Sequence, residues 1–191
     1  MKRLATVVGI LALAAPLALA QTSTWVSDPN HSEVDFSITH LTISNVHGRF
    51  GNVAATLVLN EANVTKSAVT ATIGIDTVDT GVEKRNNHLK TPDFFDAANL
   101  PLATFTSTSV AKSANGLTVT GNLTLHGVTK PVVLDVEGPT GPIQGMDHKQ
   151  HAGYSATTTL SRSAFGIGTK FPTSMVGDEV KINIELDVAK Q

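Results

Sequence analysis

The chain contains no cysteine, one tryptophan, one tyrosine and only 5% aromatic residues. The absence of cysteine excludes disulfide bonds, thiol catalysis and cysteine-ligated metal sites, so stability must come from packing. Because aromatic residues are scarce, an enclosed cavity would be lined mainly by Val, Ile, Leu and Ala. That composition suits an aliphatic ligand, although ordinary β proteins share it.

The first 20 residues have the three parts of an export signal. Lys2 and Arg3 form a positive segment, residues 4–13 form an apolar core, and residues 18–20 are a small-residue cleavage site. The run from Leu4 to Ala20 is only 17 residues, which is short for a membrane span, and it contains Thr6 and Pro16. No cysteine follows the cleavage site, which excludes a lipid-anchored lipoprotein. We therefore expect residues 1–20 to be a cleaved signal peptide and the mature protein to be periplasmic, without stable membrane insertion.

Residues 21–191 have a length that suits a single domain with a substantial core. Without Lys2 and Arg3, they carry 12 Lys and Arg against 16 Asp and Glu, a formal net charge of −4. This acidic balance argues against nucleic acid or an anionic membrane surface as the main partner. The pattern does not decide the oligomeric state, and a homodimer stays open.

Apolar and polar residues alternate through most of the chain, which is typical of half-buried β-strands. Asn115-Gly116 is a strong hairpin signal, whereas residues 138–150, with three Gly and two Pro, predict a long polar loop. Eight to ten strands separated by turn signals predict an all-β fold, either an antiparallel barrel or a sandwich. The expected strands are residues 25–26, 34–40, 46–50, 53–59, 69–75, 103–107, 117–125, 132–136, 154–160 and 180–188.

The alternation stops between residues 78 and 107. Thr80 and Glu83 have the spacing of a capping box, residues 82–89 are mostly tolerable helix formers, and Pro92 ends the run. Phe94 and Phe95, the only adjacent aromatics, follow at once. One short helix with a Phe pair, set among strands, predicts a lid over one end of a barrel.

Catalytic and metal sites have little support in the sequence. Seven histidines are present, yet there is no H-E-x-x-H and no other compact ligand set. The G-x-S-x-G signature of a hydrolase is also missing. Asp76 and Asp79 precede the predicted helix, where acidic residues favour a helix N-terminus without any catalysis. We predict no catalytic residue, no metal and no cofactor.

Cationic residues of the predicted lid are candidates for contact with a ligand head group. Arg85, His88 and Lys90 could meet an anionic head group while a hydrocarbon tail fills the lumen. A solvated helix face would explain each of the three equally well.

Several motifs, in order, resemble the YceI-like family. The densest part is the predicted lid, with Arg85, His88-Leu89 and Asp93-Phe94-Phe95-Asp96. The remaining matching positions are Asp28, His31, Ser32, Val34, Phe36, His40, Gly48, Phe50, residues 78–80, Pro101, residues 103–105, Ser107, residues 121–124, residues 127–132, Arg162, residues 165–167 and residues 176–180. Each motif is loose by itself, whereas their order and spacing together are specific. Two positions depart from the family pattern, since residues 145–147 lack a Trp and Leu100 replaces an aromatic residue.

The resemblance implies a lipocalin-like antiparallel β-barrel of about eight strands with one short lid helix, spanning residues 21–191. It implies no enzyme activity, and it implies binding of a long-chain isoprenoid-type lipid, such as a prenyl quinone or prenyl phosphate, in the barrel lumen. The expected ligand-binding residues are Phe36, Ile38, Ile73, Ile75, Arg85, His88, Phe94, Phe95, Phe105, Leu123, Leu134, Phe165, Ile182 and Ile184.

Two alternatives stay open at this point. The first is a lipid-modifying enzyme, a hydrolase or isomerase that works inside the same barrel. The second is a stress-related structural protein whose lumen is packed core.

Overall fold

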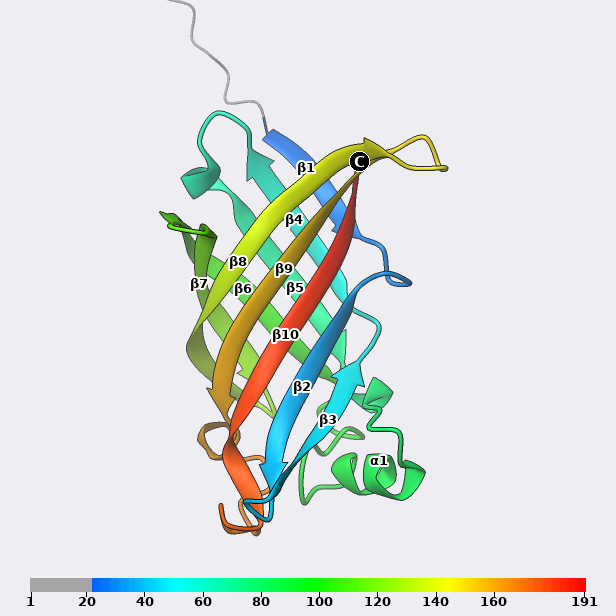
Figure 1. Cartoon of the computed structure of the whole chain (residues 1–191), viewed down its shortest axis with the longest axis vertical. Helices are drawn as coiled ribbons and strands as arrows, with labels where there is room; N and C mark the ends of the chain where they lie inside the picture. Colours follow the sequence, from blue (N-terminus) through cyan, green and yellow to red (C-terminus); the bar gives the residue numbers. More distant parts are fainter. Residues whose placement is uncertain (1–21) are drawn as a thin grey trace, which may run out of the picture.

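The computed structural model describes residues 22–191, so the expected signal peptide lies outside the described residues (Figure 1). Within residues 22–191 the structure has ten strands and one α-helix, α1 (Glu83–Leu89). The strands are β1 (Thr22–Ser27), β2 (Glu33–His40), β3 (Ser44–Phe50), β4 (Ala54–Asn60), β5 (Ala68–Gly74), β6 (Leu102–Ser113), β7 (Gly116–Leu125), β8 (Val128–Gln144), β9 (Gln150–Ser161) and β10 (Val176–Lys190).

Eight of these ten strands close into an antiparallel barrel. Its order is β1-β4-β5-β6-β7-β8-β9-β10, and β10 pairs back to β1 through residues such as Trp25 and Lys190. The β2–β3 hairpin extends the sheet, because β2 pairs with the part of β10 that β1 does not reach. The alternation left a barrel and a sandwich open, and the family resemblance implied a barrel; the barrel is confirmed. Closure leaves few exposed strand edges.

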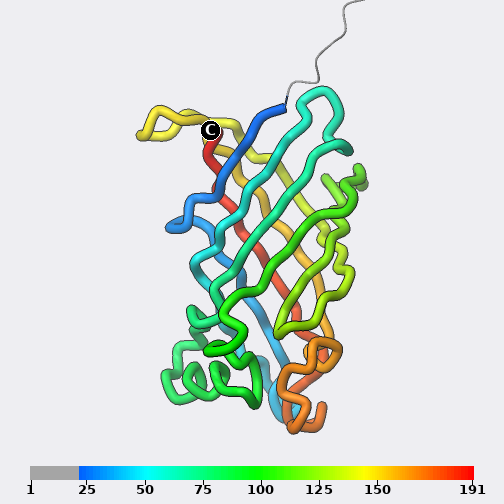
Figure 2. The backbone as a smooth tube through the Cα atoms, turned by 180° about the vertical axis from the view of Figure 1, so that it is seen from behind, coloured from blue at the N-terminus to red at the C-terminus, as the bar shows by residue number. Residues whose placement is uncertain are grey.

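The two ends of the barrel differ. One end, here called the lid end, carries α1 together with residues 91–101 and 162–175 (Figures 1 and 2). The opposite end carries the β4–β5 connection with a 3₁₀ turn, η1 (Val64–Lys66), the β6–β7 hairpin, the β8–β9 hairpin and both ends of the described chain.

The long polar loop predicted at residues 138–150 is wrong. β8 continues to Gln144 and β9 starts at Gln150, so only a short turn joins them. The register between the two strands shifts twice, between Glu137 and Thr140 and again between Thr140 and Ile143. These irregularities accommodate the two Gly-Pro pairs, which a regular ladder would exclude because proline has no N–H to donate.

The capping box predicted from Thr80 and Glu83 is also wrong, although the helix predicted after it is present. Val82 is the N-cap and makes no side-chain capping hydrogen bond. Instead the side chain of Asn86 reaches back from within the helix, and its Oδ1 accepts from the Thr80 N–H at 2.8 Å and the Thr80 hydroxyl at 2.6 Å. Asn86 thus anchors the chain that enters α1.

Candidate ligand-binding lumen

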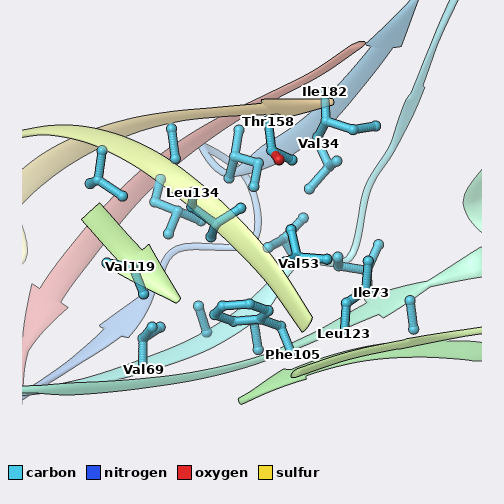
Figure 3. A pocket seen from close by; sticks show the side chains of 18 of the residues that line it. Val34, Val53, Val69, Ile73, Phe105, Val119, Leu123, Leu134, Thr158 and Ile182 are labelled. Atoms are coloured by element: carbon cyan, nitrogen blue, oxygen red, sulfur yellow. The ribbon is translucent and has the colours of Figure 1, made fainter. Parts of the chain in front are cut away.

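The inward faces of the barrel strands enclose an apolar cavity of about 460 Å³ (Figure 3). This volume lies within the range of about 300–1,000 Å³ that is typical of small-molecule sites. Alternate residues of each strand point inward, as the period-two pattern requires. Val34, Ile73, Phe105, Leu134 and Ile182 are examples, and their side chains surround the cavity in Figure 3.

Two of the phenylalanines in the wall lie over glycines of neighbouring strands. The ring of Phe36 occupies the place that a side chain on Gly48 would fill, since an added Cβ would stand 2.4 Å from the ring. Phe105 covers Gly121 in the same way, with 2.3 Å to an added Cβ. Both rings therefore lie flat along the wall, which leaves the centre of the lumen open.

The lid end of the cavity is closed by side chains from two segments. Leu89, Phe94 and Phe95 come from α1 and the residues after it, and Phe165 and Ile167 come from the β9–β10 connection. These lining residues are buried or half-buried. In addition Phe94 stacks on Phe171 with ring centroids 5.0 Å apart, which joins the two segments into one plug.

Arg162 fixes the shape of the β9–β10 connection from inside. Its side chain is buried and all its hydrogen bonds go to main-chain carbonyls. The acceptors are the carbonyls of Ile167, Gly168, Phe171, Val176 and Gly177, at 2.7–2.9 Å. The guanidinium has five N–H donors. The five hydrogen bonds use all five donors. Arg162 borders the cavity, but its guanidinium therefore has no N–H left to donate to a ligand.

An ion pair on the surface links the two halves of the plug. The Asp93 carboxylate accepts a hydrogen bond from the Lys170 ammonium, and His88 Nε2 lies 3.8 Å from Asp93 Oδ2. The hydrogen bond from Lys170 lowers the pKa of the Asp93 carboxyl below its usual value. The carboxylate therefore stays charged, and the pair stays formed, at neutral pH.

The cavity reaches the surface at the end opposite the lid. There its lining includes Glu61, Ala68 and Pro139, which are exposed, and Val64 of the η1 turn. We call this the mouth end. Glu61 Oε1 lies 3.5 Å from Lys190 Nζ, so the acidic group nearest the opening is already paired.

Twelve of the fourteen residues expected to bind a ligand line this cavity. They are Phe36, Ile38, Ile73, Ile75, Phe94, Phe95, Phe105, Leu123, Leu134, Phe165, Ile182 and Ile184. The structure thus brings together residues of six strands and three connections that the sequence separates.

Arg85 and His88 do not line the cavity. Arg85 Nε donates to the Thr80 hydroxyl at 2.7 Å and its Nη2 donates to the Thr80 carbonyl at 2.8 Å. His88 packs edge-on against Phe94 and Phe171, with centroid distances of 5.0 and 5.9 Å. Arg85 lies one turn before Leu89 on the same face of α1 and is half-buried, but its two hydrogen bonds to Thr80 hold it outside the lining, whereas His88 is exposed.

Two hydroxyl-bearing residues of the lumen were not singled out in the sequence. Tyr154 and Thr158 lie on the inward face of β9, in phase with Ala156 and Leu160, and all four line the cavity. The alternation of residues 154–160 places them on one face. Whether that face points into a cavity or into a packed core depends on the tertiary structure, and the alternation alone does not predict it.

Histidine and aspartate side chains gather near the β8–β9 hairpin without forming a metal site. His151 Nδ1 lies 2.8 Å from Asp187 Oδ1, and His151 Nε2 lies 3.1 Å from Asp147 Oδ1. Hydrogen bonding to Asp187, and then to Asp147, raises the pKa of His151. Among residues 22–191, no group of three or more His, Asp or Glu side chains is placed to hold a metal ion.

Comparison with known proteins places this barrel in a family. The model of the YceI-like domain matches residues 25–188. The chain belongs to the YceI-like family. Protein YceI of Salmonella newport is 38% identical over 157 residues, which is 81% of each chain.

Solved structures agree with the fold of this YceI-like protein. The crystal structure of Burkholderia cenocepacia BcnA matches with a TM-score of 0.72 and 28% identity, over 84% of this chain and 98% of BcnA. A polyisoprenoid-binding domain from Saccharophagus degradans matches with a TM-score of 0.64 over 87% of this chain and 98% of that domain. At 16% identity, this second likeness concerns the fold alone.

The two positions where the sequence departs from the family pattern lie outside the cavity lining. Met146 is fully exposed at the tip of the β8–β9 hairpin, and Leu100 lies in the connection that leads into β6. Neither departure changes the apolar surface of the lumen in this YceI-like protein.

Proposed function

We propose that this YceI-like protein binds a long-chain isoprenoid-type lipid in its lumen, for sequestration or transport, without chemical conversion. The observation that carries the proposal is the apolar cavity of about 460 Å³, lined by aliphatic and Phe side chains and open at one end. The polyisoprenoid-binding domain of Saccharophagus degradans, which shares the fold, supports the choice of ligand class.

The affinity would come from burial of hydrocarbon. Each CH₂ group removed from water contributes about 0.8 kcal/mol, so a prenyl chain needs no specific polar contact to bind tightly. A tail longer than the cavity would extend through the mouth end, since the lid end is plugged by Phe94, Phe95 and Phe165.

The arrangement of the lumen favours a binding role over an enzymatic one. Within residues 22–191 the ionisable side chains that line the cavity are Glu61, Tyr154 and Arg162. Glu61 is paired at the mouth, and Arg162 bonds only to main-chain carbonyls. General acid–base catalysis needs a positioned proton donor and acceptor within reach of one reacting group, and Glu61 and Arg162 lie at opposite ends of the barrel.

The mature protein would act in the periplasm. The support is the composition of residues 1–20, with Lys2 and Arg3, the apolar core and the small-residue cleavage site. Among the described residues no helix has the length and hydrophobicity needed to cross a membrane. Fractionation of cells that express the full chain should recover it in the periplasmic fraction with Gln21 as its first residue. A cytoplasmic product that begins at Met1 would contradict this.

Native mass spectrometry of the protein purified from its own periplasm, followed by organic extraction, tests the proposal. The expected result is a stoichiometric adduct that dissociates on extraction and proves to be a long-chain lipid. An apo mass that stays unchanged after incubation with isoprenoid quinones and prenyl phosphates would overturn it, and would favour a barrel without a ligand.

A further inference from the structure

The lumen is not uniformly apolar, because six polar side chains reach it. Four of them already have partners within the protein. Ser67 Oγ accepts a hydrogen bond from the Asn60 N–H at 3.0 Å, and Asn60 Oδ1 accepts one from the Asn63 N–H at 2.8 Å. Glu61 forms an ion pair with Lys190, and Arg162 donates to main-chain carbonyls. The other two are the hydroxyls of Tyr154 and Thr158.

These two hydroxyls lie on one wall. Both residues belong to the inward face of β9, with Ala156 between them, and they pair across β10 with Leu186 and Ile182. In Figure 3 the Thr158 oxygen lies among the apolar side chains of Val34, Leu134 and Ile182. The opposite wall, formed by β4 to β6 and the residue before β4, contributes apolar groups such as Val53, Ile73 and Phe105, and its polar lining residues Asn60, Glu61 and Ser67 lie at the mouth end.

Neither hydroxyl finds a partner within residues 22–191. Every side-chain nitrogen or oxygen atom of the described residues that is inaccessible and buried has a hydrogen-bond partner. A hydroxyl without one must therefore reach accessible space, and both residues line the cavity. Tyr154 is only 8% exposed, and burial alone raises the pKa of its hydroxyl, without any hydrogen bond that would change it.

An unpaired hydroxyl on an apolar wall is costly, which is why buried Tyr hydroxyls usually find a partner. We propose, on the basis of the lipid-binding function above, that Tyr154 and Thr158 hold an uncharged oxygen-bearing group of the ligand inside the lumen, along β9. The ligand would then be an alcohol, a carbonyl compound or a quinone, with its polar group within the barrel rather than in the solvent beyond the mouth.

The charge distribution favours an uncharged group over a phosphate. A phosphate in this lumen would need cationic donors to replace its water. Arg162 is the cationic side chain among the described lining residues, and its five N–H donors are taken by main-chain carbonyls. Arg85 and His88 lie outside the lining. Two neutral hydroxyls can bind a carbonyl or hydroxyl oxygen but cannot neutralise a phosphate.

Three probes with the same tail test this inference: farnesol, the hydrocarbon farnesene, and farnesyl phosphate. We would measure their dissociation constants for the wild type, for Tyr154→Phe, for Thr158→Val and for the double variant. These substitutions remove the hydroxyls and keep the shape of the side chains. Each lost hydrogen bond should weaken farnesol binding by about two- to tenfold, while farnesene binding stays unchanged. Wild type should bind farnesyl phosphate more weakly than farnesol.

Thr157→Val is the matched control, because Thr157 is the exposed neighbour on the outer face of β9. It should leave farnesol binding unchanged. Retained farnesene binding by the double variant would show that the barrel still folds. If the double variant binds farnesol as tightly as wild type, or if farnesyl phosphate binds as tightly as farnesol, the inference is wrong while lipid binding stands. If wild type binds neither farnesol nor farnesene, the proposed function fails, and the inference with it.

Discussion

At the scale of single residues, two glycines decide how much room the lumen has. Gly48 and Gly121 face inward, and each is covered by a phenylalanine ring from the adjacent strand, Phe36 and Phe105. The rings bury large apolar area while they lie along the wall. Any side chain at either glycine would move the ring into the space that a ligand would occupy. In the sequence the two glycines stood out only as part of a family pattern. The structure explains why glycine is needed at both positions, since a ring covers each of them.

The substitution Gly121→Ala should therefore reduce both stability and ligand capacity. An added Cβ would stand 2.3 Å from the ring of Phe105 and 2.6 Å from the carbonyl oxygen of Thr106, and backbone cannot give way easily. Overpacking of this kind costs about 1–3 kcal/mol. Urea denaturation should show the loss of stability, and titration with farnesene should show weaker binding because the displaced ring fills the lumen.

Gly51→Ala provides the control, since nothing lies within 4 Å of its added Cβ. Its unfolding midpoint should stay close to that of wild type. An equal loss in both variants would mean that the effect comes from glycine replacement in general and not from the covered ring.

At the scale of the elements, most strands could be predicted because each buries one face and exposes the other. The clearest case is β10, where Val180, Ile182 and Ile184 point inward and the residues between them point outward. The alternation failed at residues 138–144 because the Gly-Pro pairs of β8 signal a loop locally. In the barrel, β9 supplies a continuous partner, and bulges absorb the prolines.

The position of the mouth could not be predicted from the sequence. The lid helix and its cations suggested that a head group would sit beside Arg85 and His88. Whether an end of a barrel is open depends on what packs there, and here Phe165 and Ile167, about 80 residues beyond Arg85 and His88 in the chain, help to close the lid end. Contacts between residues so far apart in the chain produce no periodic pattern in the sequence. The local pattern therefore predicted the lid, but it did not predict which end of the barrel is open to a ligand.

The ion pair between the halves of the plug gives a pH prediction for the lid end. The pKa of Asp93 is lowered in the folded protein, chiefly by the hydrogen bond from Lys170. The ion pair of Asp93 therefore stabilises the lid end at pH values above the pKa of Asp93 in the unfolded chain, about 3.9. This stabilisation is lost as the pH falls through the lower pKa of the folded protein. Asp93→Asn should remove the charge at every pH. Hydrogen exchange of residues 163–175 at neutral pH should be faster in this variant, and acidification should then change its protection little once the rates are corrected for their intrinsic pH dependence.

Asp96→Asn is the matched control for the lid, because Asp96 bonds to Asn99 within its own loop. Its exchange rates in residues 163–175 should equal those of wild type. Should Asp93→Asn also leave these rates unchanged, the aromatic stack of Phe94 and Phe171 alone would hold the plug together.

The β8–β9 hairpin responds to pH in the opposite sense. His151 joins Asp187 on β10 to Asp147 in the turn, and these hydrogen bonds raise its pKa. The stabilisation is fully present below the unfolded pKa of about 6.5 and is lost as the pH rises through the higher, folded value. Amide exchange of residues 144–150, corrected for its intrinsic pH dependence, should show the hairpin loosening as the pH rises through that range.

His151→Asn should abolish this pH dependence, and His148→Asn, in the same turn, should preserve it. His148 has a positive φ of 64°, a conformation that Asn tolerates well, so the control adds no backbone strain. A hairpin whose exchange depends on pH equally in all three proteins would show that His151 does not hold it.

At the scale of the whole molecule, a closed sheet serves two purposes. Closure of β1 onto β10 satisfies the strand edges that an open sheet of this size would expose. The same closure surrounds a space that the few aromatic residues do not fill. With the lid end plugged by Phe94, Phe95 and Phe165, that space communicates with the surface through the mouth end. A ligand would enter and leave at the end formed by the β4–β5 connection and the β6–β7 hairpin.

If the lumen is the binding site, a single charged side chain that points into it should prevent the lipid from binding. Ile73 lines the cavity from β5, and in Ile73→Asp a carboxylate would replace an aliphatic group in contact with the ligand. Burying that carboxylate against hydrocarbon is unfavourable, so water should accompany it and displace the lipid. Thr72→Asp places the same charge on the outer face of the same strand, where Thr72 pairs with Ala54 and Thr104. Native mass spectrometry of both variants from the periplasm should find lipid in Thr72→Asp and none in Ile73→Asp, with thermal unfolding to confirm that each is folded. A lipid adduct of equal occupancy in the two variants would mean that the ligand lies outside the lumen, and the barrel would then be a scaffold for an outer site.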